Sequence, residues 1–385
     1  MRVVIVSRIY APEVSAASAL LQSWAVEFRD RGHDVIVITT KPPPRHTPDD
    51  PPGIAVKRAP VLRDKQQYVR GYASYLSFDL PLFWRLMRTP RADLYVVEPP
   101  PTTVAVVRAV AGLKGTPYVV DAADLWSDAA AMATRSRFVL RALSLLERWG
   151  LRGARHLFAA HQPLIDRFRE VGIRTPSTPI GFGADTTTFA YSEPVSTSPH
   201  FVYAGTHSEW HGAAIFVEAF AEIASRHPQA RLTFIGNGQE RDELIAIARA
   251  HNLSERVEFR APIPPAELAP VLADATASLA SLRPGHGYDY AFTTKIYSSL
   301  AVGCPVVFAG VGPTSRFIRE AENSDIGTAL PYDAPAVAQA LQRILDEPLP
   351  ADRRRALSAW THEHYSLNAI AVTVVDTSLG LVVDR

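Results

Sequence analysis

The sequence predicts an α/β protein built from two successive units, each a parallel sheet doubly wound by helices. Continuous β-branched runs such as Val3–Val6 are typical of strands that are buried on both faces of a parallel sheet. Strand and helix patterns alternate along the chain, and the alternation restarts after a stretch rich in Pro, Thr, Ser and Gly, Arg174–Pro199. Because such sheets bind ligands at the carboxyl ends of their strands, two facing units imply a cleft between them.

The first unit opens as strand, helix and strand. Val3–Val6 is followed by a loop and an amphipathic helix that ends at Gly32, and Val35–Ile38 is the second strand. Such a unit is normally a right-handed parallel crossover. The alternation then continues through the expected strands Leu94–Val97, Tyr118–Val120 and His156–Ala159 and the expected helices Thr102–Leu113, Arg137–Leu151 and Leu164–Val171.

The apolar residues of Arg174–Pro199 show neither helical nor strand spacing, so this stretch is the predicted linker. The strands expected beyond it are Phe201–Tyr203, Arg231–Ile235, Val257–Phe259, Ala277–Leu282 and Pro305–Phe308. The helices expected beyond it are Ala213–Arg226, Glu240–His251, Pro265–Ala273, Phe292–Val302 and Pro335–Leu345. The last stretch, Ala369–Val383, is too apolar to be left as a bare tail.

Composition excludes several classes of protein. The 385 residues carry 40 basic and 39 acidic side chains, a net charge of +1, which argues against a dedicated nucleic-acid binder. The single cysteine, Cys304, cannot form an internal disulfide, and no apolar stretch reaches the roughly 18 residues of a membrane span. Neither a Cys-x-x-Cys motif nor a convergent histidine set indicates a metal site. We expect a soluble, cytoplasmic protein that uses no metal.

Two glycine-containing loops follow predicted strands of the second unit. Gly205-Thr206-His207 follows Phe201–Tyr203, and Gly236-Asn237-Gly238 follows Arg231–Ile235. Glycine lets backbone approach a ligand closely, and the N–H groups at a helix start favour anions, so this pair suits a phosphate or diphosphate. The alternative is that each glycine only makes the tight corner of a strand–helix turn.

Charged residues stand at the predicted carboxyl ends of strands in both units. Arg283 ends one strand and Lys295 lies in the following helix; they either neutralise a diphosphate leaving group or are ordinary surface cations. Asp121 and Asp124 follow a strand of the first unit, where a carboxylate can act as a base, bind a hydroxyl or cap a helix.

A basic segment, Arg135–Arg155, interleaves arginines with leucines and a tryptophan. Such a helix can lie on an anionic membrane surface. The alternative is an ordinary amphipathic helix that packs on its own sheet.

Several ordered segments carry a family resemblance. Together they resemble the family 4 glycosyltransferases, retaining enzymes of the GT-B fold with two facing Rossmann-like domains. The branch most similar acts in bacterial surface polysaccharide and O-antigen assembly. The segments that carry the resemblance are Tyr10–Glu13, Gly32–Val35, Glu98–Pro101, Asp121–Trp126, Gly181–Asp185, Tyr203–Gly205, Phe234–Gly238, Val257–Arg260 and Lys295–Val306.

The resemblance implies an acceptor-binding domain over residues 1–180 and a nucleotide-sugar-binding domain over 181–365. Residues 366–385 would return to the first domain. It further implies transfer of a sugar from a UDP-, GDP- or dTDP-sugar to an acceptor hydroxyl, with no cofactor. The acceptor would be a lipid-linked glycan or a small molecule, with peripheral contact at the inner face of the membrane in the first case.

The resemblance also assigns roles to residues. Catalytic roles fall to Lys295, Arg283 and Asp124. Donor binding falls to Gly205, Thr206, His207, Gly236, Asn237, Gly238, Arg260, Ala261, Pro262, Asp289, Tyr290, Thr293, Thr294 and Ser298, and acceptor binding to Ser15, Ala16, Glu98, Asp121 and Trp126. Tyr290 and Ser298 stand where the family carries its paired glutamates, with Asp289 as a substitute. The alternative from another functional class is a two-lobed protein that binds a nucleotide sugar and catalyses no reaction.

Overall fold

The computed structural model describes the chain except for residues 14, 44–47, 49, 65–68, 70, 134–135, 196–197, 286–288 and 384–385. It divides into two compact units. The first comprises Met1–Phe182 together with Leu367–Arg385, and the second is Gly183–Ser366. In the described part of the chain, no helix combines the length and hydropathy that a membrane crossing requires.

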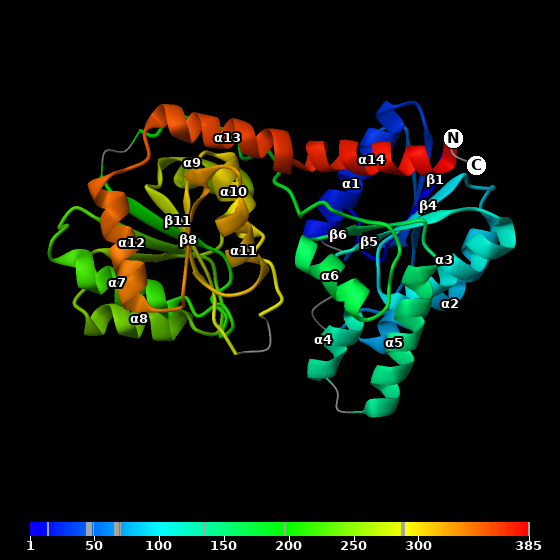
Figure 1. Cartoon of the computed structure of the whole chain (residues 1–385), viewed down its shortest axis with the longest axis horizontal. Helices are drawn as coiled ribbons and strands as arrows, with labels where there is room; N and C mark the ends of the chain where they lie inside the picture. The colour runs from blue at the N-terminus through cyan, green and yellow to red at the C-terminus, as the bar shows by residue number, and fades with distance from the viewer. Residues whose placement is uncertain are drawn as a thin grey trace. The chain divides into compact units, whose positions relative to one another are not determined.

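Unit 1 is built on a seven-stranded parallel sheet (Figure 1), with strand order β3-β2-β1-β4-β5-β6-β7. The strands are β1 (Arg2–Val6), β2 (Asp34–Thr40), β3 (Ile54–Ala59), β4 (Leu94–Val97), β5 (Tyr118–Ala122), β6 (His156–Ala159) and β7 (Ser177–Pro179). The helices are α1 (Ala16–Asp30), α2 (Tyr72–Arg88), α3 (Pro101–Lys114), α4 (Trp126–Ala133), α5 (Arg137–Arg152), α6 (Gln162–Glu170) and α14 (Leu367–Val383).

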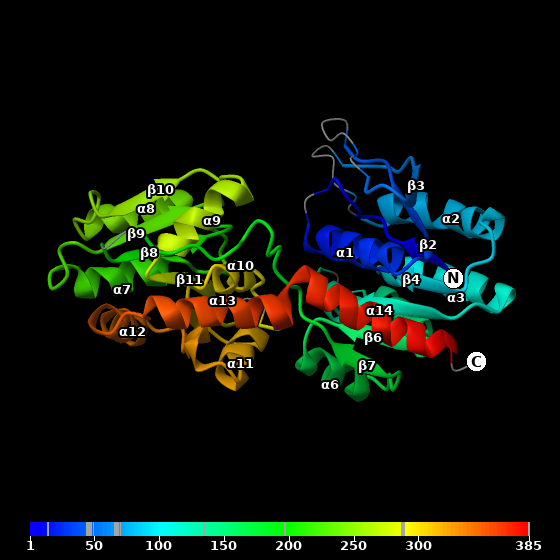
Figure 2. The same cartoon turned by 90° about the horizontal axis from the view of Figure 1, so that it is seen from above.

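Two apolar layers cover the sheet of unit 1. Helices α2, α3, α5 and α6 pack on one face, and α1 and α14 pack on the other. Figure 2 shows α14, the last helix, running beside α1. The contact buries Ile370, Val374 and Val375 of α14 in the same cluster as Trp24 and Phe28 of α1. The C-terminal helix is therefore part of the core of unit 1.

Unit 2 contains a six-stranded parallel sheet with strand order β10-β9-β8-β11-β12-β13. Its strands are β8 (His200–Ala204), β9 (Arg231–Ile235), β10 (Val257–Arg260), β11 (Ala277–Leu282), β12 (Val306–Gly310) and β13 (Gly327–Leu330). Its helices are α7 (Ala214–Ala224), α8 (Arg241–Ala250), α9 (Pro265–Asp274), α10 (Lys295–Ala301), α11 (Pro313–Glu320), α12 (Ala334–Asp346) and α13 (Ala351–Tyr365). Helices α7, α8 and α12 cover one face and α10, α11 and α13 the other.

The predicted fold class is confirmed, because both sheets are parallel and wound by helices on both faces. The predicted linker, Arg174–Pro199, contains the boundary between the units at Phe182, but its first part also contains strand β7. The helix expected from Phe292 begins only at Lys295, and the Thr293 N–H just before it donates to the Thr314 hydroxyl.

Candidate functional site

The two glycine loops of unit 2 continue the ladder between β8 and β9. The Gly205 N–H donates to the Ile235 carbonyl at 2.8 Å, and the His207 N–H donates to the Asn237 carbonyl at 3.0 Å. These two donors are therefore used within the protein and are not available to a ligand. Thr206 and Asn237 are exposed, and their N–H groups make no hydrogen bond to the described part of the chain. Two neighbouring backbone donors remain for an anion.

The glycines are needed because these loops are in backbone contact. Gly236 has a φ of +147°, and a Cβ there would lie 2.0 Å from the Gly205 carbonyl oxygen. A Cβ on Gly238 would lie 2.1 Å from the His207 carbonyl oxygen. The Gly236 N–H donates to the Arg260 carbonyl at the end of β10, so it also serves the protein. The glycines are thus required by the close approach of the two loops to each other.

Lys295 lies against the first glycine loop, although 90 positions separate it from Gly205. A Cβ on Gly205 would come within 2.6 Å of the Lys295 ammonium nitrogen. This ammonium donates to the Tyr203 hydroxyl at 3.0 Å and lies 4.1 Å from the centre of the Tyr203 ring. The structure therefore brings together a cation, a glycine and two free backbone donors at the carboxyl ends of β8 and β9.

The surroundings of Lys295 disfavour its charged form. Burial lowers the pKa of its ammonium from the usual 10.5 to about 7. No carboxylate pairs with it among the described residues, and its hydrogen-bond partner, the Tyr203 hydroxyl, is neutral. A diphosphate placed beside the ammonium would favour its charged form and raise this pKa again.

His207 has a different place from the one expected. Its side chain is fully buried, with ring centres 5.8 Å from Tyr203 and 5.9 Å from Phe234. Neither ring nitrogen has a hydrogen-bond partner in the described part of the chain, and burial, followed by Lys295 and Arg241, lowers the pKa of its imidazole to about 4. The neutral ring fills the space beneath the loops, so His207 supports the candidate site by packing.

Arg283 is exposed and lies at the far end of the first loop. Its N–H donates to the Trp210 carbonyl, and its Cβ lies near Gly212, whose carbonyl accepts from the Tyr332 hydroxyl. Arg283 thus lies beside Gly212, whereas Lys295 lies beside Gly205. Of the two predicted catalytic cations, only Lys295 is therefore placed at the glycine loops.

The other predicted donor-binding residues are spread around the same sheet edge. Asp289 and Tyr290 are exposed, and the Asp289 carboxylate accepts from the Gly285 N–H at 3.1 Å within its own loop. Thr294 precedes helix α10 and Ser298 lies within it, half-buried. The Arg260 carbonyl is already occupied by Gly236, which leaves the exposed Ala261 and Pro262 for any contact with a base.

Unit 1 gathers carboxyl groups at the carboxyl ends of β4 and β5. Glu98 accepts from the Ser7 hydroxyl at 3.0 Å, and burial raises the pKa of its carboxyl to about 7. Asp121 is 3% exposed; burial first, and then the Glu98 and Asp124 carboxylates, raise its pKa to about 8. Asp124 itself is exposed. This cluster can hold protons at neutral pH and suits hydroxyl groups better than anions.

Arg8 belongs to this cluster and was missed from the sequence. It is 2% exposed, and its guanidinium lies 4.0 Å from the centre of the Tyr75 ring and 5.7 Å from that of Trp126. Its charge lowers the pKa of Glu98 against the effect of burial. The available signal was its position, because Arg8 is the second residue after β1 and Glu98 is the first after β4.

Trp126 and the opening loop are fixed by local capping. The Trp126 N–H donates to the buried Glu147 carboxylate at 2.7 Å, and Glu147 thereby caps helix α4 from α5. The Ser15 hydroxyl accepts from the Ser18 N–H at 3.1 Å and caps α1, and Ala16 is already the first residue of that helix. Ser15 and Ala16 therefore have structural roles here, in addition to the predicted acceptor contact.

Replacing Asp121 with asparagine should raise the thermal midpoint of unfolding at pH 8 and leave it nearly unchanged at pH 4. The folded-state pKa of Asp121, about 8, lies above the unfolded value of about 3.9. Its contribution to stability is therefore fully present below pH 4 and is lost as the pH rises through 8, by up to about 1.4 kcal/mol per pH unit. Asparagine has no proton to lose.

Thermal melts of both proteins between pH 4 and 8 measure this difference. The exposed Asp346, changed to asparagine, is the control and should leave the pH profile unchanged. Parallel profiles for Asp121→Asn and the wild-type protein would contradict the raised pKa.

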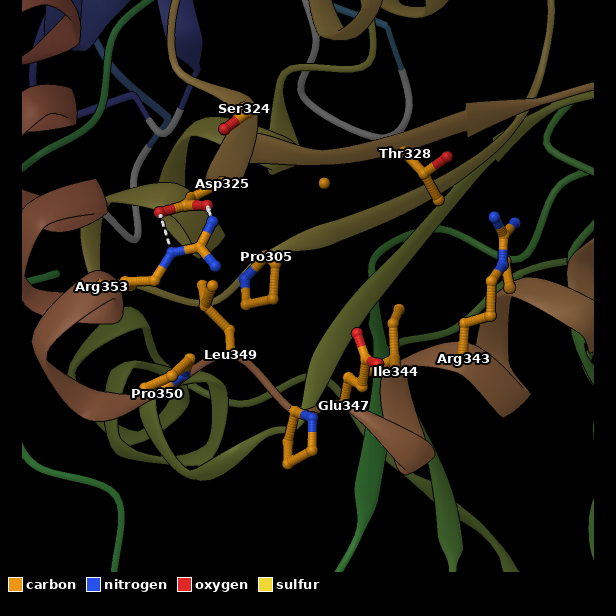
Figure 3. Close-up of a pocket in the computed structure, with 13 residues that line it drawn as sticks. Pro305, Ser324, Asp325, Thr328, Arg343, Ile344, Glu347, Leu349, Pro350 and Arg353 are labelled. Atoms are coloured by element: carbon orange, nitrogen blue, oxygen red, sulfur yellow. Dashed lines mark hydrogen bonds and ion pairs between the residues drawn. The ribbon is translucent and has the colours of Figure 1, made fainter.

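A cavity of about 450 Å³ lies elsewhere in unit 2, as Figure 3 shows. Its walls include Pro305, which precedes β12, and Thr328 of β13, so it opens near the amino ends of these strands. The ion pair between Asp325 and Arg353 closes one side. This cavity is at the opposite end of the sheet from the glycine loops. Among the described residues, no group of three or more His, Cys, Asp and Glu side chains could hold a metal ion.

Comparisons with known families agree with this architecture. Residues 16–182 match the family "Glycosyl transferase 4-like domain", and residues 198–347 match "Glycosyl transferases group 1". The structure superposes on a sucrose-phosphate synthase from Thermosynechococcus elongatus with a TM-score of 0.76 and 18% identity, covering 100% of both chains. The chain therefore carries two regions similar to glycosyltransferase domains, and its fold is the GT-B fold.

Two further solved structures are similar to this chain over almost its whole length. HepE of Anabaena, solved in complex with UDP, has a TM-score of 0.72 at 18% identity and covers 98% of this chain and 99% of its own. WaaG, described as a glycosyltransferase involved in lipopolysaccharide biosynthesis, has a TM-score of 0.68 at 16% identity and covers 98% of this chain and 100% of its own. These likenesses show the fold.

Sequence relatives with curated names match only part of the chain. A glycogen synthase of Mycobacterium tuberculosis is 28% identical over 167 residues, 43% of this chain and 38% of the relative. A D-inositol 3-phosphate glycosyltransferase of Acidothermus cellulolyticus is 31% identical over 157 residues, 38% of this chain and 34% of the relative. The matched region thus spans little more than a third of the length of these relatives.

Proposed function

We propose that the protein is a retaining glycosyltransferase that moves a sugar from a nucleotide diphosphate sugar to an acceptor hydroxyl. One observation carries the proposal: the Lys295 ammonium lies against Gly205, beside the free N–H groups of Thr206 and Asn237. A cation and two backbone donors suit the diphosphate of the donor. UDP is the first nucleotide to test, because the structural neighbour HepE was solved with UDP and with UDP-glucose.

The reaction needs charge stabilisation more than a pair of carboxylates. As the glycosidic bond to the diphosphate breaks, negative charge grows on the leaving phosphate, and Lys295 stabilises it. An oxygen of the same phosphate takes the proton from the acceptor hydroxyl, which then attacks the anomeric carbon from the face that the diphosphate leaves. This route retains the anomeric configuration. It is compatible with Tyr290 and Ser298 at the positions of the family's paired glutamates.

We assign acceptor binding to unit 1. The carboxyl groups of Glu98 and Asp121 can accept hydrogen bonds from sugar hydroxyls, and the ring of Trp126 offers an apolar face for a sugar. We favour a sugar-bearing acceptor in bacterial surface glycan assembly, in the cytoplasm at the inner face of the membrane. The second candidate acceptor is a small natural product, as in the structural neighbour from avilamycin A biosynthesis.

A non-catalytic protein that binds nucleotide sugars is the alternative from another class. The replacement of both glutamates by Tyr290 and Ser298 favours it. Incubation with UDP-, GDP- and dTDP-sugars separates the two, because a transferase releases the nucleoside diphosphate and a binding protein does not. Proton NMR of the glycosylated product then reads the anomeric configuration. An inverted product would refute retention, and tight binding of a donor without turnover on any acceptor would favour the binding protein.

A further inference from the structure

We propose that the surface of unit 1 formed by helices α2, α3 and α5 docks the protein on an anionic lipid bilayer. The three helices lie side by side, with α3 in contact with both α2 and α5. They pack on one face of the sheet, away from α1 and α14 on the other face (Figure 1). We call their outward side the basic helix surface.

Large apolar side chains are concentrated on the basic helix surface. It carries eight of the thirteen exposed large apolar residues in the described part of the chain. On α2 they recur every three or four residues, which places them in one stripe along the helix. The eight are Leu76, Leu80, Trp84, Met87, Leu113, Phe138, Leu145 and Trp149. Leu80 is 69% exposed, Trp84 60% and Phe138 83%, far more than packing within the unit requires.

The charge of the basic helix surface has a single sign. The three helices contain eight basic residues, Arg85, Arg88, Arg108, Lys114, Arg137, Arg141, Arg148 and Arg152. They contain two acidic residues, Asp79 and Glu147, and both are buried. None of the eight forms an ion pair with a carboxylate in the described part of the chain. Since the whole chain has a net charge of only +1, this concentration of positive charge is local.

Cations and aromatic rings are also adjacent on this surface. The Arg108 guanidinium lies 4.3 Å from the centre of the Trp149 ring and so links α3 to α5. Trp84, Arg85 and Arg88 line a surface depression of about 480 Å³ on α2. Tryptophan with an apolar body and a polar N–H, beside arginines that attract anionic headgroups, is typical of side chains at a membrane interface. Charge and apolar burial together supply the two signals that stable membrane binding needs.

Two other occupants fit less well. In a two-fold dimer through this surface, the exposed cations Arg88, Arg137, Arg141 and Arg152 would face their own copies, and the three helices offer no exposed carboxylate between them. A nucleic acid would match the charge but would leave the aliphatic side chains of Leu76 and Leu80 without a partner. A bilayer matches both the charge and the apolar stripes.

The inference deepens the proposed function and rests on it in one respect. If the protein is a glycosyltransferase, a bilayer-bound unit 1 favours a lipid-linked acceptor over a soluble one. Binding to a bilayer itself requires neither donor nor turnover, so the two proposals can fail separately.

Flotation of the full-length protein with vesicles tests the proposal. We expect binding to vesicles of phosphatidylcholine with about one third phosphatidylglycerol, and at least about tenfold weaker binding to pure phosphatidylcholine. Raising the salt from about 0.1 M to about 0.5 M should weaken binding to the anionic vesicles by a similar factor, because the charge term is screened.

Two double variants separate the charge term from the apolar term. Arg88→Glu with Arg141→Glu should abolish the preference for anionic vesicles. Leu80→Ser with Trp84→Ser should weaken binding at both salt concentrations. All four side chains are exposed, so the variants should fold, which thermal melts verify.

The matched control is Arg226→Glu with Arg249→Glu, which makes the same charge change on exposed positions of unit 2. It should bind vesicles as the wild-type protein does. Calorimetry with UDP on every variant reports the proposed donor site independently.

Three results would overturn the bilayer proposal. The first is that the protein does not bind anionic vesicles. The second is that the control variant and the test variants change vesicle binding equally. The third is that the surface binds single-stranded RNA or a second copy of the protein but does not bind vesicles. Unchanged UDP affinity in any of these cases would leave the proposed glycosyl transfer standing, with a soluble acceptor.

Discussion

Replacing Lys295 with alanine is expected to lower turnover by about 10²–10³, the usual effect of removing one electrostatic partner of the transition state. The ammonium lies against Gly205, and its side-chain partner among the described residues is the Tyr203 hydroxyl. It is therefore available to the charge that develops on the departing diphosphate. Steady-state kinetics with the donor that turns over best measures the loss.

The fold should survive this substitution. Burial disfavours the ammonium, as its lowered pKa shows, so removing the charge costs little stability. Lys295→Met keeps the length of the side chain and should lose as much turnover as alanine with a thermal midpoint no lower than that of the wild-type protein. Arg249→Ala, an exposed cation of the same unit, is the control. Wild-type turnover in either Lys295 variant would contradict its role.

The pH dependence gives the same prediction a second readout. With a pKa of about 7 in the free protein, Lys295 loses its charge as the pH rises from 6 to 8. We expect kcat/KM for the donor to fall over this range, because it reports the free enzyme. The value of kcat should fall at higher pH, because the bound diphosphate raises the pKa of the ammonium. In Lys295→Arg, the fall of kcat/KM and the fall of kcat should both move above pH 8, because the guanidinium stays charged.

The central strands of both sheets could be predicted because they are buried on both faces. Apart from Arg2 of β1, strands β1, β4 and β11 consist of apolar or small residues, a pattern typical of strands buried on both faces of a parallel sheet. The edge strand β3 was missed, since residues Ile54–Ala59 alternate between buried and exposed and carry Lys57 and Arg58. Helix α14 was hard to predict from its valines and Gly380, and it forms because packing on α1 outweighs propensity.

The candidate site could be predicted in outline by topology. Lys295 follows β11, Gly205 follows β8, and the two strands are neighbours in the sheet. Residues at the carboxyl ends of neighbouring parallel strands are brought together whatever their separation in the chain. The sequence could not show that the Gly205 N–H is used by Ile235, because that bond depends on the register between β8 and β9. Nor could it show that His207 is buried.

Replacing Gly236 with alanine is expected to weaken UDP binding by about ten- to a hundredfold. The new Cβ would lie 2.0 Å from the Gly205 carbonyl oxygen, at a φ of +147° that alanine rarely adopts. The two loops must therefore separate, which costs about 1–3 kcal/mol and moves the N–H groups of Thr206 and Asn237 apart. Because these donors and Lys295 act on one diphosphate, the affinity should fall by that amount. Isothermal titration with UDP measures it.

Gly327 supplies a control with the same kind of clash at the other end of the same sheet. A Cβ there would lie 1.9 Å from the Val306 carbonyl oxygen, at a φ of +124°. Gly327→Ala should lower the thermal midpoint of unfolding as much as Gly236→Ala does, while the folded protein keeps its affinity for UDP. In helix α3, Gly112 meets nothing within 4 Å, and alanine there should stabilise unit 1 by roughly 0.5–1 kcal/mol without any effect on UDP. Equal losses of UDP affinity in Gly236→Ala and Gly327→Ala would mean that general destabilisation, and not the spacing of the two loops, governs binding.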